Sequence, residues 1–133
     1  MITSKEQERA KKAWDLVNET PKTVIDKYAS LAKSAPVMIL TNGLGQTLAF
    51  FISKGKSKQY SLMYEHLNAW LSDNVVWSKN EDIDDNLIER VIHEKSQGYR
   101  MATEEALAFL AWVKRFAAAL SKEGENNEIA VAV

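Results

Sequence analysis

The segment 34–53 constrains the fold most, because it holds no charged residue in 20 positions. It contains Pro36 and the run Asn42-Gly43-Leu44-Gly45-Gln46-Thr47, and three lysines follow it within five positions. A window of this length and composition raises three possibilities: a membrane span, a glycine-rich phosphate-binding loop, or a helix buried in a protein interior.

A buried helix is favoured. Only 11 of the 20 residues are apolar, and polar side chains such as Thr41 and Gln46 would lie near the bilayer centre of a span. The glycine run lacks the third glycine of a dinucleotide fingerprint, a preceding strand, and a following Lys-Ser/Thr pair. The apolar residues instead keep helical spacing: Val37, Leu40, Leu44, Leu48, Phe51 and Ile52. We therefore expect a helix that starts near Pro36, with Gly43 and Gly45 weakening it or allowing close approach of a neighbouring helix.

The same periodicity predicts an all-α, compact single-domain helical bundle of about five to six helices. Ser4 and Gln7 have capping-box spacing at the start of the first helix. Pro21 suits the first position of a second helix, and Pro36 is expected to end or bend it. Further helices are expected over about 60–71, 85–94 and 103–121, and Gly98 lies in the break before the last of these. We assign 1–124 to the domain and 125–133 to a frayed tail.

The last helix is apolar almost all round, with Phe109 and Phe116 widening its main face and Trp112 nearly opposite that face. Such a helix is either central in the fold or covered by a partner. Central placement is the simpler interpretation. The partner interpretation assigns Trp112 and Phe116 to an interface.

Composition excludes several classes of protein. The chain of 133 residues has no cysteine, so a disulfide framework, a thiol nucleophile and a cysteine-ligated metal are impossible. The charged N-terminal stretch lacks the apolar core of a signal peptide, and we expect a cytoplasmic protein without a membrane segment.

Charge is distributed unevenly although the net charge is only −1. Residues 1–58 carry ten Lys/Arg and five Asp/Glu, whereas residues 59–98 carry three and eight. This asymmetry can mark a charged partner, and solvated helix faces can also produce it.

Catalytic and metal-binding signals are weak. His66 and His93 stand 27 positions apart without zinc-ligand spacing around either. The acidic segment Glu81–Asp85 could attract Mg²⁺, although a solvated loop before a helix explains it more simply. We see no nucleophile with a base, and we expect no catalytic residue, no metal and no cofactor.

Two blocks of the sequence resemble the Cmr small-subunit family of the type III-B CRISPR-Cas system. The first is "KYASLAKSAPVMILTNGLGQTLAF", residues 27–50, and the second is "YRMATEEALAFLAWVKRFA", residues 99–117. Together they cover 43 of the 133 residues, in the expected order. Gly45 departs from the pattern, because a bulkier apolar residue is expected there.

The resemblance implies a non-catalytic, all-helical subunit of an RNA-guided effector complex. Its partners would be other Cmr subunits, further copies of itself, and the guide RNA–target RNA duplex. Small subunits of this family stack along the backbone subunits and line a positive channel for target RNA. RNA cleavage belongs to the backbone subunits, which agrees with the absence of catalytic signals here.

Guide pairing supplies sequence recognition, so such a subunit needs shape and positive charge only. We assign the candidate nucleic-acid contacts to eight cations: Lys27, Lys33, Lys54, Lys56, Lys58, Arg100, Lys114 and Arg115. Two alternatives remain open. One is a protein–protein adaptor that does not touch RNA, and the other is a small metal-dependent enzyme that uses Glu81–Asp85.

Overall fold

The computed structural model describes residues 3–122, and these residues form six α-helices and no strand. The helices are α1 (Lys5–Asn18), α2 (Ile25–Asn42), α3 (Leu44–Ser53), α4 (Lys58–Asn74), α5 (Leu87–Ile92) and α6 (Ser96–Leu120). The all-α prediction is confirmed. The predicted tail 125–133 lies outside the described residues, and the domain boundary at 124 stays a prediction.

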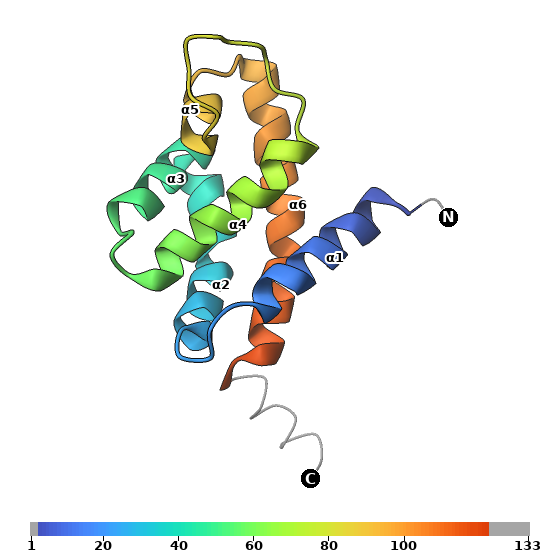
Figure 1. Cartoon of the computed structure of the whole chain (residues 1–133), viewed down its shortest axis with the longest axis vertical. Helices are drawn as coiled ribbons and strands as arrows, with labels where there is room; N and C mark the ends of the chain where they lie inside the picture. Colours follow the sequence, from blue (N-terminus) through green and yellow to red (C-terminus); the bar gives the residue numbers. More distant parts are fainter. Residues whose placement is uncertain (1–2, 123–133) are drawn as a thin grey trace.

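α6 is the central element of the bundle. Figure 1 shows α6 running almost the full height of the molecule, with α2 beside it and α1 crossing it at an angle. Ala102, Ala106, Leu110, Val113 and Ala117 are completely buried on α6. The nearly continuous apolar surface of this helix is therefore used mostly inside the fold.

The charge-free window forms the second half of α2 and all of α3, and its buried side chains include Ile39, Leu44, Leu48 and Phe51. No helix among the described residues is long and apolar enough to cross a membrane. The expected interior segment is present, but two members of its expected apolar face are exposed: Val37 at 62% and Leu40 at 73%.

The predicted boundary at Pro36 is wrong, because α2 continues through Pro36 to Asn42. The break falls at Gly43, whose φ of 88° and ψ of 158° lie in a region that only glycine occupies readily. The Gly43 N–H donates to the Ile39 carbonyl at 2.8 Å, and the Gly43 carbonyl accepts from the Thr47 hydroxyl at 2.8 Å. One glycine thus ends α2 and begins α3.

The other helix boundaries differ more modestly from those expected. Ser4 caps α1 with Gln7 in the predicted capping box. Pro21 opens a turn, in which its carbonyl accepts from Ile25 N–H at 3.0 Å, and α2 begins only at Ile25. α6 begins at Ser96 rather than near Thr103, so Gly98 lies in its first turn and does not separate two elements.

A buried polar pair joins α2 to α4. The Tyr28 hydroxyl lies 2.6 Å from His66 Nδ1, and the two rings meet edge to face. Burial lowers the pKa of His66 to about 4 and raises the pKa of Tyr28. The imidazole is therefore neutral near pH 7, and its Nδ1 shares a hydrogen bond with the Tyr28 hydroxyl.

Replacement of Gly43 by alanine should lower the free energy of unfolding by about 1–3 kcal/mol, because an L-residue is strained at this backbone conformation. Its Cβ would also lie 3.1 Å from the Tyr99 hydroxyl. Urea denaturation measures the loss. Gly45→Ala is the matched control, since its Cβ would lie at an ordinary 3.4 Å from the same hydroxyl and alanine favours the helix. Equal stability of the two variants would contradict the role of Gly43.

Acid should destabilise the fold through His66. The unfolded chain binds a proton on this histidine as the pH falls through about 6.5. The folded chain binds it only near the lowered pKa of about 4. The free energy of unfolding should therefore fall by up to about 3 kcal/mol from pH 6.5 to 4. In His66→Gln this pH dependence should be shallower than in His93→Gln, whose imidazole is exposed. Parallel profiles would refute the assignment.

Candidate nucleic-acid interface

The eight predicted cations fall in three separate places on the structure. Lys33, Lys114 and Arg115 lie on α2 and α6, whereas Lys54, Lys56 and Lys58 lie at the junction of α3 and α4. Lys27 lies on the side of α2 that faces this junction, because it lines a hollow with Gln59 and Tyr60. Arg100 stands apart in the first turns of α6. The structure therefore does not bring the eight together in one patch.

The packing of α2 against α6 sets the position of the first group. The two helices run antiparallel, and near each end of the pair a hydrogen bond from a residue just beyond one helix reaches the other helix. Lys122 N–H donates to Asp26 Oδ1 at 2.8 Å, and Gly45 N–H donates to the Tyr99 hydroxyl at 2.8 Å. This register places Lys33 and Lys114 at similar heights along the pair. We call the outer side of the two helices, with Lys33, Lys114, Arg115 and Lys122, the α2–α6 face.

Among residues 3–122, few carboxylates border the α2–α6 face. Residues 27–42 of α2, and residues 106–122 at the end of α6 and just after it, contain no Asp or Glu. Asp26, at the end of the face, binds the Lys122 backbone and shares a shallow hollow of about 330 Å³ with Lys33 and Lys122. A surface with cations and so few anions favours contact with a polyanion.

A second cationic surface surrounds the start of α4. Lys27 lines a hollow of about 370 Å³ with Ser30, Ser34, Gln59 and Tyr60. The Tyr60 ring meets the Phe50 ring edge to face at 5.7 Å, and Lys54 Nζ lies 5.9 Å from the centre of Phe50. We call this surface the lysine face, and its residues are Lys27, Lys54, Lys56, Lys58, Phe50 and Tyr60.

The sequence held a signal for both surfaces that analysis of individual residues missed. From Lys27 to Tyr64 there is no Asp or Glu in 38 consecutive residues, and five lysines fall in this stretch. Most of α2, all of α3 and the start of α4 therefore present one sign of charge, whatever the details of their packing.

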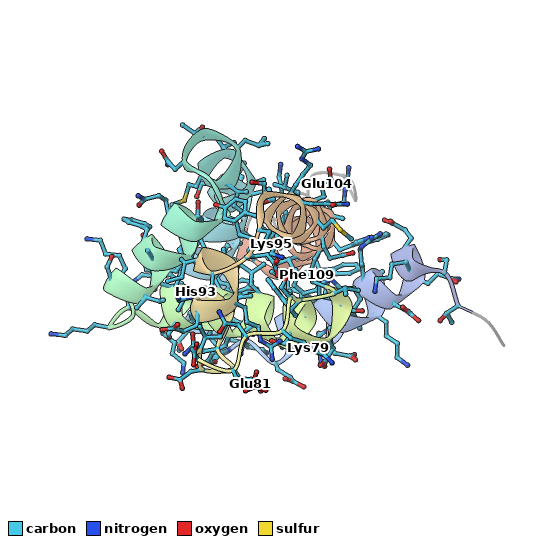
Figure 2. The ribbon with its side chains drawn as sticks, turned by 90° about the horizontal axis from the view of Figure 1, so that it is seen from above. Lys79, Glu81, His93, Lys95, Glu104 and Phe109 are labelled. Carbon is cyan, nitrogen blue, oxygen red and sulfur yellow. The ribbon has the colours of Figure 1, made fainter. Side chains whose placement is uncertain are left out.

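Arg100 has a different environment. It lines a hollow of about 500 Å³ together with Glu94 and Glu104. In Figure 2, Glu104 points away from α4, on the opposite side of the molecule from Glu81. Arg100 also lies about 22 Å along α6 from Arg115. Two carboxylates in the same hollow make phosphate binding less favourable there, and the contact assigned to Arg100 stays a prediction.

Trp112 and Phe116, the predicted partner residues, lie against α1. The Trp112 indole N–H donates to Glu6 Oε1 at 2.7 Å, and its ring stacks on Phe116 at 5.6 Å. Trp14 of α1 meets Phe116 edge to face at 5.1 Å. Both predicted residues are half-buried within the chain, while Trp14 remains 45% exposed. Their role toward a partner stays a prediction.

The contacts that hold α1 in place have no local signal in the sequence. Arg9 makes two hydrogen bonds to the Glu105 carboxylate, at 2.6 and 3.0 Å, and the Trp70 indole N–H donates to Glu105 at 3.0 Å. Burial acts to raise the pKa of Glu105, but the hydrogen bonds from Arg9 and Trp70 outweigh it and lower that pKa. This carboxylate therefore stays ionised and ties α1 and α4 to α6.

No arrangement in residues 3–122 suits metal catalysis. No group of three His, Asp or Glu side chains in this part of the chain could hold a metal ion. His66 is engaged with Tyr28, and His93 Nδ1 lies 2.9 Å from the Glu89 carbonyl. Within the acidic segment Glu81–Asp85, Asp85 pairs with Arg90 at 2.6 Å.

Comparison with known proteins agrees with the earlier resemblance. A family model described as CRISPR-associated protein (Cas_Cmr5) matches residues 5–120. A curated protein of Thermotoga maritima, named CRISPR system Cmr subunit Cmr5, is 32% identical over 127 residues, covering 91% of this chain and 87% of the relative. A protein of the same name from Thermus thermophilus is 30% identical over 131 residues, covering 92% of this chain and 100% of the relative.

Proposed function

Because the chain belongs to the CRISPR-associated Cas_Cmr5 family, we propose that it is the small subunit of a type III-B Cmr effector complex and lines its target-RNA channel. Membership of a Cmr complex follows from the family and from the names of both relatives. The stacking of several copies along the backbone subunits, the contact with RNA and a location in the cytoplasm are the finer parts of the proposal.

The α2–α6 face is the surface that we assign to RNA. Lys33, Lys114 and Arg115 place cations on two packed helices, and the adjoining segments carry no carboxylate. Contacts of this kind reach phosphates and carry no sequence information, which suits a complex in which the guide strand reads the target. The absence of carboxylates from residues 27–42 and 106–122 carries this assignment.

The subunit has no chemical step in this proposal. The two histidines do not share a site, since His66 is buried with Tyr28 and His93 is exposed. The subunit instead contributes shape and a positive surface beside the guide RNA–target RNA duplex.

The adaptor alternative also has an observation in its favour. Val37 and Leu40 are 62% and 73% exposed, next to Lys33 on α2. Exposed apolar side chains in a group often mark protein contacts. If this side of α2 meets only another subunit, RNA affinity should not depend on the cations of the face.

The double reversal Lys114→Glu and Arg115→Glu should weaken target-RNA binding by the reconstituted Cmr complex. If both residues contact phosphates, the slope of log K against log salt should fall by about 1 to 2. Fluorescence anisotropy over a salt series measures the slope, and circular dichroism checks that the helix content is unchanged.

The matched control is Lys11→Glu and Lys12→Glu, an adjacent pair on α1 that shares its hollow with Glu8 and Asp15. The control should leave RNA binding within about twofold, because its surroundings already carry carboxylates. Equal RNA binding by the wild-type complex and the Lys114/Arg115-reversed complex at low salt would contradict an RNA contact at the α2–α6 face. It would favour the protein–protein adaptor instead.

A further inference from the structure

The hollow of the lysine face combines an aromatic ring with a cation. It lies between the first half of α2 and the start of α4, and its volume is about 370 Å³. Figure 1 shows these two segments close together toward the lower left. Such a volume lies at the small end of the range for ligand sites in proteins, roughly 300–1,000 Å³. The lining residues are Lys27, Ser30, Leu31, Ser34, Gln59 and Tyr60.

The aromatic ring of the hollow is held by its neighbours. The Tyr60 ring meets the Phe50 ring edge to face at 5.7 Å, and it lies 6.2 Å from the Phe51 ring. Phe51 is completely buried, whereas Tyr60 is half-buried and borders the hollow. Packing therefore orients the ring in advance, and a planar group that stacks on it has little ordering entropy to overcome.

Polar groups around the ring are available to a ligand. Within the part of the chain that the structure describes, Lys27 Nζ, the Gln59 amide and the Tyr60 hydroxyl make no hydrogen bond or ion pair. The Gln59 amide supplies both donors and an acceptor. A ligand with an aromatic face and a polar edge matches this arrangement, and a nucleobase has both.

The charge around the hollow has one sign. Every residue that lines it belongs to the stretch 27–64, which contains no Asp or Glu. Lys54 Nζ lies 5.9 Å from the centre of the Phe50 ring, which packs on Tyr60. Lys56 and Lys58 follow in the connection to α4 and at its start. Phosphates on either side of a bound base would therefore meet cations.

The other hollows described for residues 3–122 lack this combination. The hollow on the α2–α6 face contains Asp26 and no aromatic ring. Trp70, Tyr99 and Trp77 each border another hollow, and each of those hollows contains at least one carboxylate. A carboxylate beside the ring would repel the phosphates that flank a stacked base.

We propose that this hollow binds one unpaired nucleotide of a single strand of nucleic acid. The base stacks on Tyr60 and presents its polar edge to Gln59. The neighbouring phosphates lie near Lys27 and Lys54. Such a site is tolerant of sequence, because every base has an aromatic face. The inference goes beyond the proposed function, since it concerns a second surface and an unpaired nucleotide rather than phosphates beside the guide RNA–target RNA duplex.

Fluorescence anisotropy of labelled strands of about eight nucleotides tests the proposal on the full chain. The probes are oligo(U) RNA and oligo(dT) DNA at about 0.05 M salt, where screening is weak. Wild type should bind a single strand, and the tighter of the two probes identifies the source of the nucleotide. An abasic strand of equal length and charge should bind at least about fivefold more weakly, because it cannot stack. Equal binding of the abasic strand would overturn the base site.

Variants of the hollow test the residues. Tyr60→Phe keeps the ring and should bind within about twofold of wild type, whereas Tyr60→Ser should lose at least about fivefold. Because Tyr60 also packs on apolar neighbours, a second variant leaves that packing intact. Gln59→Glu puts a carboxylate into the hollow and should weaken binding at least about tenfold.

Gln46→Glu is the matched control for Gln59→Glu. Gln46 is exposed on α3 in the same carboxylate-free stretch, and it does not line the hollow. The control should bind within about twofold of wild type, since the charge change is the same but lies elsewhere. Equal binding by the two glutamate variants would overturn the proposal. So would a wild type that binds neither probe at millimolar protein concentration.

The Lys114/Arg115 reversal distinguishes this proposal from the proposed function. Both residues lie outside the hollow, so the reversed free chain should bind the short strand within about threefold of wild type. If Gln59→Glu weakens that binding while the reversal leaves target-RNA binding by the complex unchanged, the base site stands and the RNA assignment of the α2–α6 face fails. If only the reversal has an effect, the base site fails and the proposed function stands.

Discussion

The close packing of α2 on α6 is the contact on which the rest of this structure depends. Both helices bury alanines completely, among them Ala32, Ala35, Ala102 and Ala106, and such small side chains let neighbouring backbones approach closely. Hydrogen bonds near both ends fix the register. That register decides which lysines share the outer surface, and it brings Tyr99 against Gly43 and Gly45. The helix break and the candidate RNA surface are therefore consequences of one packing arrangement.

Local signals in the sequence were sufficient for the fold class and for most helices, because apolar periodicity and capping chemistry act within a few residues. The Ser4–Gln7 box is an example. The break between α2 and α3 was misplaced for a physical reason. Proline removes one backbone donor, and that loss can be tolerated inside a packed helix. Gly43 allows a backbone conformation that other residues avoid, and Tyr99, more than 50 positions away, lies close to it. Tertiary contact decided between the two candidates.

The candidate site was less predictable than the fold. The residue types were identified, but their division into an α2–α6 face, a lysine face and the isolated Arg100 depends on helix rotation and register. The same limit explains Arg9 and Glu105, which pair across 96 positions without any local pattern. Trp112 illustrates the converse. Its place on the outer side of an apolar helix suggested a partner, and α1 of the same chain lies against it.

α2 carries a cation of each cationic surface. Lys27 lines the hollow beside α4 and Lys33 lines the hollow beside α6, and Ser30 borders both hollows. If copies stack as proposed, their α2–α6 faces recur along the assembly. A polyanion that contacts a few cations on each copy would then gain affinity from the number of copies, without any one subunit binding it tightly.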